Sequence, residues 1–251
     1  SASEWAVTAR GFNGPYSAKL LVMVDGRSVY SPIYSGVHWD TLDVPLEDIA
    51  RIEVIRGPGG TLWGTNAMNG MINIITKSSK DTVGSYVSVG GGSEERLNDI
   101  ARYGERLGDH GTYRVYAKHF ERDAGTAREE AGDDWRQGRF GFRSDWDVGG
   151  SQADKLTVQG DHYVGESGYR TFSGPPPFGG ITYGDTDVTG QDVLGRYQHV
   201  LDDGSDWTLQ AYYDKYYRRS PQLLETVDTY DLDLQYHFHW GERHQVICGT
   251  G

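Results

Sequence analysis

Residues 20–77 carry the sequence pattern that decides the fold. They read LLVMVDGRSVYSPIYSGVHWDTLDVPLEDIARIEVIRGPGGTLWGTNAMNGMINIITK. The apolar run Leu20–Val24 predicts a buried strand, Asp25-Gly26 predicts a tight turn, and Arg27–Tyr30 predicts the returning strand. Pro45–Ile49 predicts a single helical turn, because proline fits the start of a helix.

Two further strands are predicted at Arg51–Ile55 and Met71–Thr76, on either side of the glycine-rich run GPGGTLWGTNAMNG. Glycine has no Cβ, so such a run allows close backbone approach and left-handed turns. Residues 1–80 are therefore predicted to form a small mixed α/β domain.

From about Thr82 the pattern changes to long alternating strands. In Asp228–Trp240, apolar and aromatic side chains occupy the even positions from Tyr230 onward, and polar side chains occupy the odd positions. Several runs approach the ~9–11 residues that a tilted strand needs to cross a bilayer. We expect nine such strands, over residues 82–90, 96–105, 112–121, 135–146, 154–164, 190–201, 207–217, 228–239 and 244–251.

The connections between these strands alternate between short and long. Long loops are expected at 122–134, 165–189 and 218–227, and tight turns at 106–111, 147–153, 202–206 and 240–243. Short turns at one rim and longer loops at the other are the layout of an outer-membrane barrel, whereas a soluble sandwich has no reason to sort its loops in this way. Aromatic residues near strand ends suggest interfacial girdles: Trp135, Trp146, Trp207, Tyr216, Tyr217 and Trp240.

Several motifs in residues 20–77 resemble the plug of TonB-dependent outer-membrane receptors. They are VDG at Val24–Gly26, IRGPGGTLWG at Ile55–Gly64 and INIITK at Ile72–Lys77, and Arg10-Gly11 resembles an upstream element of the same plug. A strand-rich region directly after the plug is also the family's order. The resemblance implies a plug domain at residues 1–80 and antiparallel transmembrane β-barrel strands at residues 81–251.

The resemblance also implies what the intact protein does. Such a receptor binds a scarce nutrient chelate (an iron–siderophore, cobalamin or similar) at the outer membrane and imports it with energy from TonB. Members have about 22 strands around a plugged lumen, so the nine strands and the absent TonB box imply that this chain is a fragment. No covalent chemistry and no cofactor are expected, hence no enzyme. The alternative is a passive or surface-binding barrel that keeps a plug-like insert.

The best candidate for the ligand site is Tyr30–Asp43, which combines aromatic rings with several hydroxyls, as suits a bulky ligand. In the family, the matching loop and the one near Asn13–Ser17 form the outward-facing plug apex. The matching family arginines, here Arg10 and Arg56, bond to barrel-wall glutamates. The expected ligand-binding residues are Asn13, Tyr16, Tyr30, Tyr34, His38 and Trp39.

Other functions fit the sequence less well. The net charge of −12 disfavours nucleic-acid binding, which needs clustered Lys and Arg. Thr65 stands where a phosphate-binding loop has Lys, and no nucleophile elbow indicates a hydrolase. His237 and His239 share one strand face with Asp231 and Asp233; we interpret this set as a polar lumen wall and predict no metal site.

Overall fold

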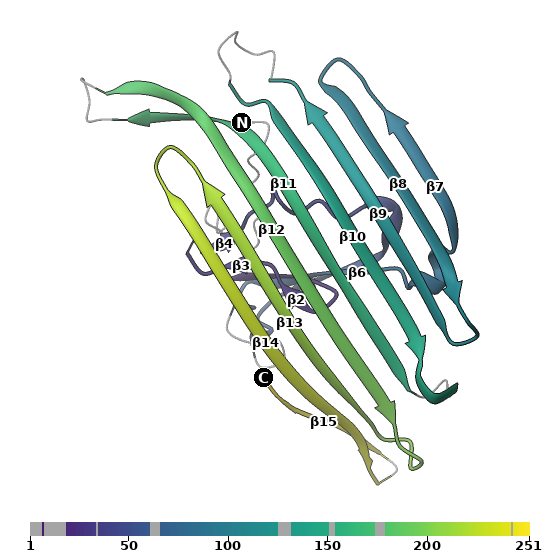
Figure 1. Ribbon diagram of the computed structural model, residues 1–251. Helices are drawn as coiled ribbons and strands as arrows, with labels where there is room; N and C mark the ends of the chain where they lie inside the picture. The colour runs from purple at the N-terminus through teal and green to yellow at the C-terminus, as the bar shows by residue number, and fades with distance from the viewer. Residues whose placement is uncertain are drawn as a thin grey trace.

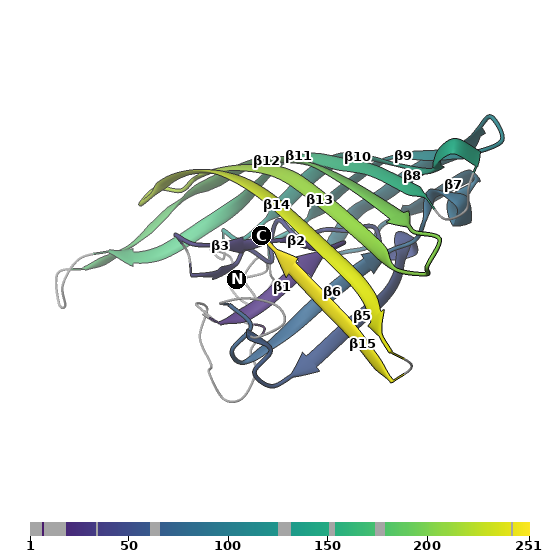
Figure 2. The same cartoon turned by 90° about the horizontal axis from the view of Figure 1, so that it is seen from below.

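The computed structural model describes residues 7, 19–33, 35–60, 66–124, 132–150, 154–173, 179–241 and 243–251. The described residues form one large antiparallel sheet, one small four-stranded sheet and a two-stranded pair (Figure 1). Figure 2 shows the large sheet as a single curved layer, with the small sheet and its loops lying against the concave side. The curvature follows from the twist that strands adopt when they pair.

The small sheet, here called the plug sheet, has the strand order β2-β1-β6-β5. Its strands are β1 (Leu20–Val24), β2 (Arg27–Ser28), β5 (Ile49–Arg56) and β6 (Gly70–Thr76). A separate pair, β3 (Tyr30–Ser31) and β4 (Gly36–Val37), follows β2. β1 is buried along its whole length, as its unbroken apolar run predicts, because it lies between two neighbouring strands.

Two apolar clusters hold the plug sheet together from within. Leu21 and Met23 pack with Ala67 and Met71 on one face, and Leu20 and Val22 pack with Val37 on the other. All buried members belong to residues 20–71, so the plug sheet has apolar clusters made of its own residues.

The predicted turn at Asp25-Gly26 is confirmed. Both residues have positive φ, 51° and 86°, which is the signature of a type I′ turn that suits a two-residue hairpin loop. The Asp25 carboxylate accepts hydrogen bonds from the Thr76 backbone N–H at 2.9 Å and from its hydroxyl at 2.7 Å. The turn is therefore tied to the end of β6 inside the plug.

The large sheet, here called the wall, has nine strands that pair strictly in chain order. They are β7 (Gly84–Gly90), β8 (Glu95–Leu107), β9 (Gly111–Arg122), β10 (Trp135–Asp147), β11 (Lys155–Ser173), β12 (Gly180–Val200), β13 (Asp206–Arg219), β14 (Leu224–Trp240) and β15 (His244–Thr250). The meander confirms the predicted fold class, and β7 and β15 are its two edges.

Helices are few and short. Among the described residues they are 3₁₀ turns: η1 (Leu46–Asp48), η2 (Ser79–Thr82) and η3 (Val148–Gly150). η1 begins after Pro45, as the sequence predicts. No helix in the described part of the chain is long and apolar enough to cross a membrane.

The predicted loop at residues 165–189 is wrong for most of its length. β11 and β12 pair continuously from Lys155 with Gln198 to Ser173 with Gly180, so the two strands extend beyond their neighbours (Figure 1). The many glycines of this stretch lower its strand propensity, but the cross-strand ladder overrides that preference. The predicted loop at 218–227 also shortens, because β13 runs to Arg219 and β14 begins at Leu224.

The wall has one apolar face and one polar face. Tyr230, Leu232 and Leu234 are exposed on the convex face, at 77%, 61% and 42%. Trp135 and Tyr216 are not on this face: both are buried on the concave side, so their predicted place in an aromatic girdle is wrong. A position near a strand end suggests an interfacial girdle, but the alternation of side chains along a strand decides whether a residue faces lipid or the concave side.

β5 and its last residue, Arg56, are mostly exposed in this chain. β5 is an edge strand of the plug sheet and lies on the side away from β11 and β12 (Figure 2). The described strands of the wall do not cover that side.

The two faces of β14 generate a stability prediction for the intact barrel. Leu234→Arg should lower the free energy of unfolding by about 2–4 kcal/mol, because it places a cation on the lipid face. Gln235→Arg is the matched control and should cost far less, since Gln235 faces the concave side. Unfolding measured in bilayers checks this, and equal costs for the two variants would contradict the assignment of faces.

Candidate functional site

The contact between the plug sheet, with its loops, and the concave side of the wall is here called the seam. Charged and hydrogen-bonding groups dominate it, in contrast to the apolar clusters inside the plug. At the end where the chain passes from plug to wall, the Ser79 side chain is fully buried and bonds to Asp145 and Thr112. Nearby, Asp48 forms ion pairs with Arg102 and Arg114.

The Asp25-Gly26 turn and Arg27 form the middle of the seam. Asp25 lies 3.5 Å from Arg143 and accepts a hydrogen bond from the Gln159 amide at 2.9 Å. Arg27 donates to Asp192 at 2.8 Å and also to Asp214. Buried charges need such partners, because desolvation of an unpaired ion is costly.

The backbone conformation favours glycine at position 26. Its φ of 86° is unfavourable for any residue with a Cβ. A Cβ would also lie 2.9 Å from atoms of Arg196 and Gln210 on the wall. The turn therefore lies against the side-chain ends of Arg196 and Gln210, which would have to shift to admit a Cβ.

The segment Tyr30–Asp43 forms the part of the seam nearest the rim where β13 ends. Asp40 pairs with Arg218 at 2.8 Å and Asp43 with Lys118 at 2.5 Å. Arg139 donates to the Thr41 backbone carbonyl at 2.6 Å. Here acidic plug residues pair with basic wall residues. At Arg27 the charges are the other way round, since a basic plug residue pairs with acidic wall residues.

His38 contacts the wall through its ring nitrogen Nε2, which lies 2.9 Å from the Tyr216 hydroxyl and 3.6 Å from a Glu225 carboxylate oxygen. Burial, together with the positive charge of Arg218, lowers the pKa of His38 to about 4, although Asp40 acts in the opposite direction. The ring is therefore neutral at pH 7, and its contact with Glu225 is not an ion pair there. With the ring proton on Nδ1, Tyr216 donates to Nε2.

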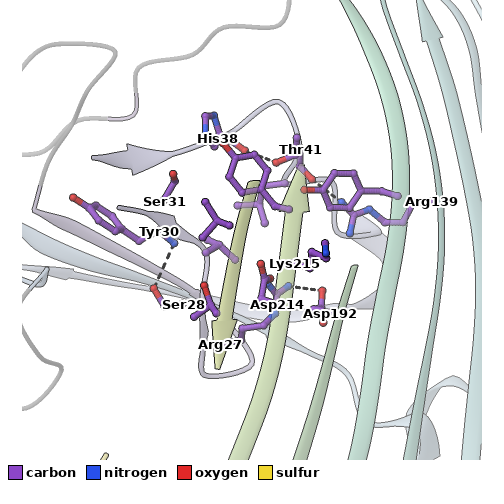
Figure 3. A pocket seen from close by; sticks show the side chains of 16 residues that line it. Arg27, Ser28, Tyr30, Ser31, His38, Thr41, Arg139, Asp192, Asp214 and Lys215 are labelled. Carbon is purple, nitrogen blue, oxygen red and sulfur yellow. Dashed lines mark hydrogen bonds and ion pairs between the residues drawn. The ribbon is translucent and has the colours of Figure 1, made fainter. Parts of the chain in front are cut away.

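A cavity of about 70 Å³ lies in the seam beside these contacts (Figure 3). Its lining includes Arg27, His38, Arg139 and Tyr216. Ligand pockets for drug-sized molecules are about 300–1,000 Å³, so this cavity suits a few water molecules and is too small for a chelate.

Three of the expected ligand-binding residues lie among the described residues: Tyr30, His38 and Trp39. Their surroundings differ. The Tyr30 ring points away from Arg139 and Asp192 in Figure 3. His38 contacts the wall, as described above. Trp39 packs against the apolar cluster of Leu20 and Val22, which is a structural role. Asn13, Tyr16, Tyr34 and Arg10 lie outside the described residues.

Arg56 is exposed, and no ion pair joins it to another described residue, so its predicted pairing with wall glutamates stays a prediction. His237 lies 3.5 Å from Asp206. Within the described ranges, no cluster of three or more His, Cys, Asp or Glu side chains has a geometry that could hold a metal.

Sequence reasoning missed the role of Arg27 and of its partners Asp192 and Asp214. The available signal was the period of two in β12 and β13, which places both carboxylates on the face opposite the apolar stripe. Nothing in the sequence pairs residue 27 with residues so far along the chain.

Comparison with known proteins identifies the family. Residues 2–71 match the model of the TonB-dependent receptor plug domain. This match covers the plug sheet through β5 and the first residues of β6; the rest of β6 and η2 lie between it and the first wall strand. Residues 2–71 therefore belong to the plug-domain family of TonB-dependent receptors.

Curated relatives of this chain include two proteins named vitamin B12 transporter BtuB. The one from Vibrio vulnificus is 44% identical over 89 residues, which is 36% of this chain and 14% of the relative. The one from Photobacterium profundum is 33% identical over 168 residues, which is 65% of this chain and 27% of the relative. The chain thus spans about a quarter or less of the length of these two relatives.

Solved structures of TonB-dependent receptors share the fold. The ferripyoverdine receptor of Pseudomonas aeruginosa aligns with a TM-score of 0.69 at 17% identity, covering 97% of this chain and 36% of that one. The ferric-catecholate import receptor Fiu of E. coli K12 aligns with a TM-score of 0.62 at 16% identity, covering 90% and 40%. At these identities the likeness shows the fold alone.

The buried His38 predicts that docking of the plug onto the wall depends on pH. Its pKa is lower when docked (about 4) than in the unfolded state (about 6.5), so protonation favours undocking. Docking stability should be full above pH 6.5 and fall by about 3 kcal/mol as the pH drops towards 4. Unfolding of the plug in the intact receptor, measured between pH 7 and pH 4, checks this.

His38→Gln should remove this part of the pH dependence, and His237→Gln, a change at an exposed wall residue, should not. The same pH slope in wild type and in His38→Gln would show that His38 does not carry the effect.

Proposed function

We propose that the intact receptor lies in the outer membrane, binds a scarce nutrient chelate from outside, and imports it into the periplasm with energy from TonB. The observation that carries this proposal is that the plug-domain match contains a sheet with its own apolar clusters, seated on the concave side of the wall by polar contacts. Such a body closes the lumen at rest and is able to move. The named relatives are transporters and receptors, which supports a transport protein and not an enzyme.

We further propose that residues 1–80 are the plug domain and residues 81–251 the first part of the barrel. The plug sheet ends at Thr76 and the wall begins at Gly84, which supports a boundary between them. η2, at Ser79–Thr82, would then be the joint.

For the ligand, the segment Tyr30–Asp43 remains our candidate, together with Asn13 and Tyr16. The contacts of Asp40 with Arg218 and of His38 with Glu225 support this choice, because they lie where β13 ends and β14 begins. The same rim carries the tip of the extended β11–β12 hairpin (Figure 1). Tyr30 and Tyr34 are the residues best suited to touch the ligand, and we assign His38 and Trp39 to hold the segment in place.

The chemical class of the ligand is a large chelate. Cobalamin is the first to test, since the two sequence relatives are named vitamin B12 transporters. Ferric siderophores are the second class, suggested by the printed names of the fold neighbours. A passive barrel with a plug-like insert is the rival function, and dependence on TonB distinguishes the two.

Growth of a receptor-deletion strain that carries the intact receptor gene tests the proposal. We expect growth to depend on one chelate from a panel of cobalamin and ferric chelates, and to fail when the tonB gene is also deleted. Tyr30→Ala should weaken binding of that chelate severalfold, and Lys80→Ala, at the opposite rim, should leave it unchanged. Chelate-dependent growth that survives loss of TonB would instead support the passive barrel.

A further inference from the structure

Three aspartates form a row across the concave face of the wall. Asp161 on β11 lies directly opposite Asp192 on β12, which in turn lies directly opposite Asp214 on β13. Directly opposite residues in antiparallel strands point to the same face, and like charges in such pairs repel each other. The row is therefore unstable unless cations lie against it.

Two guanidinium groups offset most of the negative charge of this row, and they come from different parts of the molecule. Arg139 belongs to the wall itself and lies 3.6 Å from Asp161. Arg27 belongs to the plug and contacts both Asp192 and Asp214. Only 11% of the Arg27 side chain is exposed, so the plug inserts a tethered cation between two wall carboxylates.

Cavities lie on both sides of the Arg27 contact. The cavity of about 70 Å³ beside His38 is lined by Arg27, Asp192 and Asp214. A second cavity, of about 30 Å³, is lined by Arg27, Asp192, Asp48 and Arg114 on the side towards the joint with the wall. Arg27 and Asp192 line both cavities, so their ion pair borders each of them.

The seam is able to open here without loss of the plug core. The apolar clusters lie inside the plug, so withdrawal of the turn exposes charges that water solvates, and little apolar surface. The turn keeps its shape when it is withdrawn, because Asp25 is bonded to Thr76 within the plug. The desolvation cost of a buried ion pair is recovered when water enters, which offsets much of the lost attraction.

We propose that Arg27 is a releasable latch. When Arg27 is seated on Asp192 and Asp214, it seals the seam. When it is withdrawn, the two cavities join into a water-filled path along β11–β13, and the row of aspartates is free to bind a cationic group. The role of this latch in a transport cycle rests on the proposed function. Its sealing role is testable without substrate or TonB, so the two proposals can fail separately.

The test measures ion leak through the intact receptor in planar bilayers. Arg27→Ala should raise the leak severalfold over wild type, because the seal is lost. Lys80→Ala is the matched control: Lys80 also forms a plug–wall ion pair, with Asp147 at 2.7 Å, but it is 45% exposed and borders neither cavity, so no rise is expected.

Chemical rescue makes the test specific for a cation seated on the row. Guanidinium chloride at millimolar concentration should reduce the leak of Arg27→Ala by refilling the vacated site, and tetramethylammonium chloride at equal ionic strength should not. A leak equal to that of Lys80→Ala would overturn the proposal, and so would equal effects of the two salts.

A folding defect in Arg27→Ala is detected by the heat-induced mobility shift of the folded barrel in gel electrophoresis. Arg27→Gln keeps the side-chain length, removes the charge and serves as the second variant. It should also leak more than wild type, and a folded Arg27→Gln receptor with wild-type leak would contradict the latch.

Discussion

The polar seam is the constraint on which the rest of the structure depends. A plug inside a barrel must stay in place at rest and must also be able to move, and apolar packing against the wall would make movement costly. This chain puts its apolar clusters inside the plug and its charges at the seam. Paired charges hold the plug specifically, since each requires its own partner, and water is able to replace those partners when the seam opens.

The geometry of one turn makes this arrangement possible. Gly26 lets the backbone reach the wall, and Asp25 fixes the turn to the end of β6. Arg27 follows directly and reaches two strands of the wall. The same carboxylate of Asp25 also accepts a bond from Gln159, so one residue belongs to both the plug and the seam. The turn is therefore the point where folding of the plug and its docking are coupled.

Local patterns predicted the local structure well. The run Leu20–Val24 and the Asp-Gly pair gave the first hairpin, and alternation gave the nine wall strands, because these features depend on near neighbours and on period. The β11–β12 extension was missed, since pairing along the hairpin overrides the weak strand propensity of glycine. The partners of Arg27 could not be predicted, because they depend on how the plug sits on the wall. Tyr216 lies near a strand end, which suggests an interfacial position, but the period of two puts it on the concave face.

Hydrogen exchange in the intact receptor tests the central claim, that the plug is a body with its own core, held to the wall by a polar seam. The informative comparison is between wild type and the double variant Asp25→Asn, Arg27→Ala. Our account predicts faster exchange at the backbone amides of residues 25–28 and 38–43, with unchanged protection at Leu21, Val22 and along β6 before Thr76. Equal loss of protection in β1 and β6 would contradict it, because the plug core would then depend on the wall.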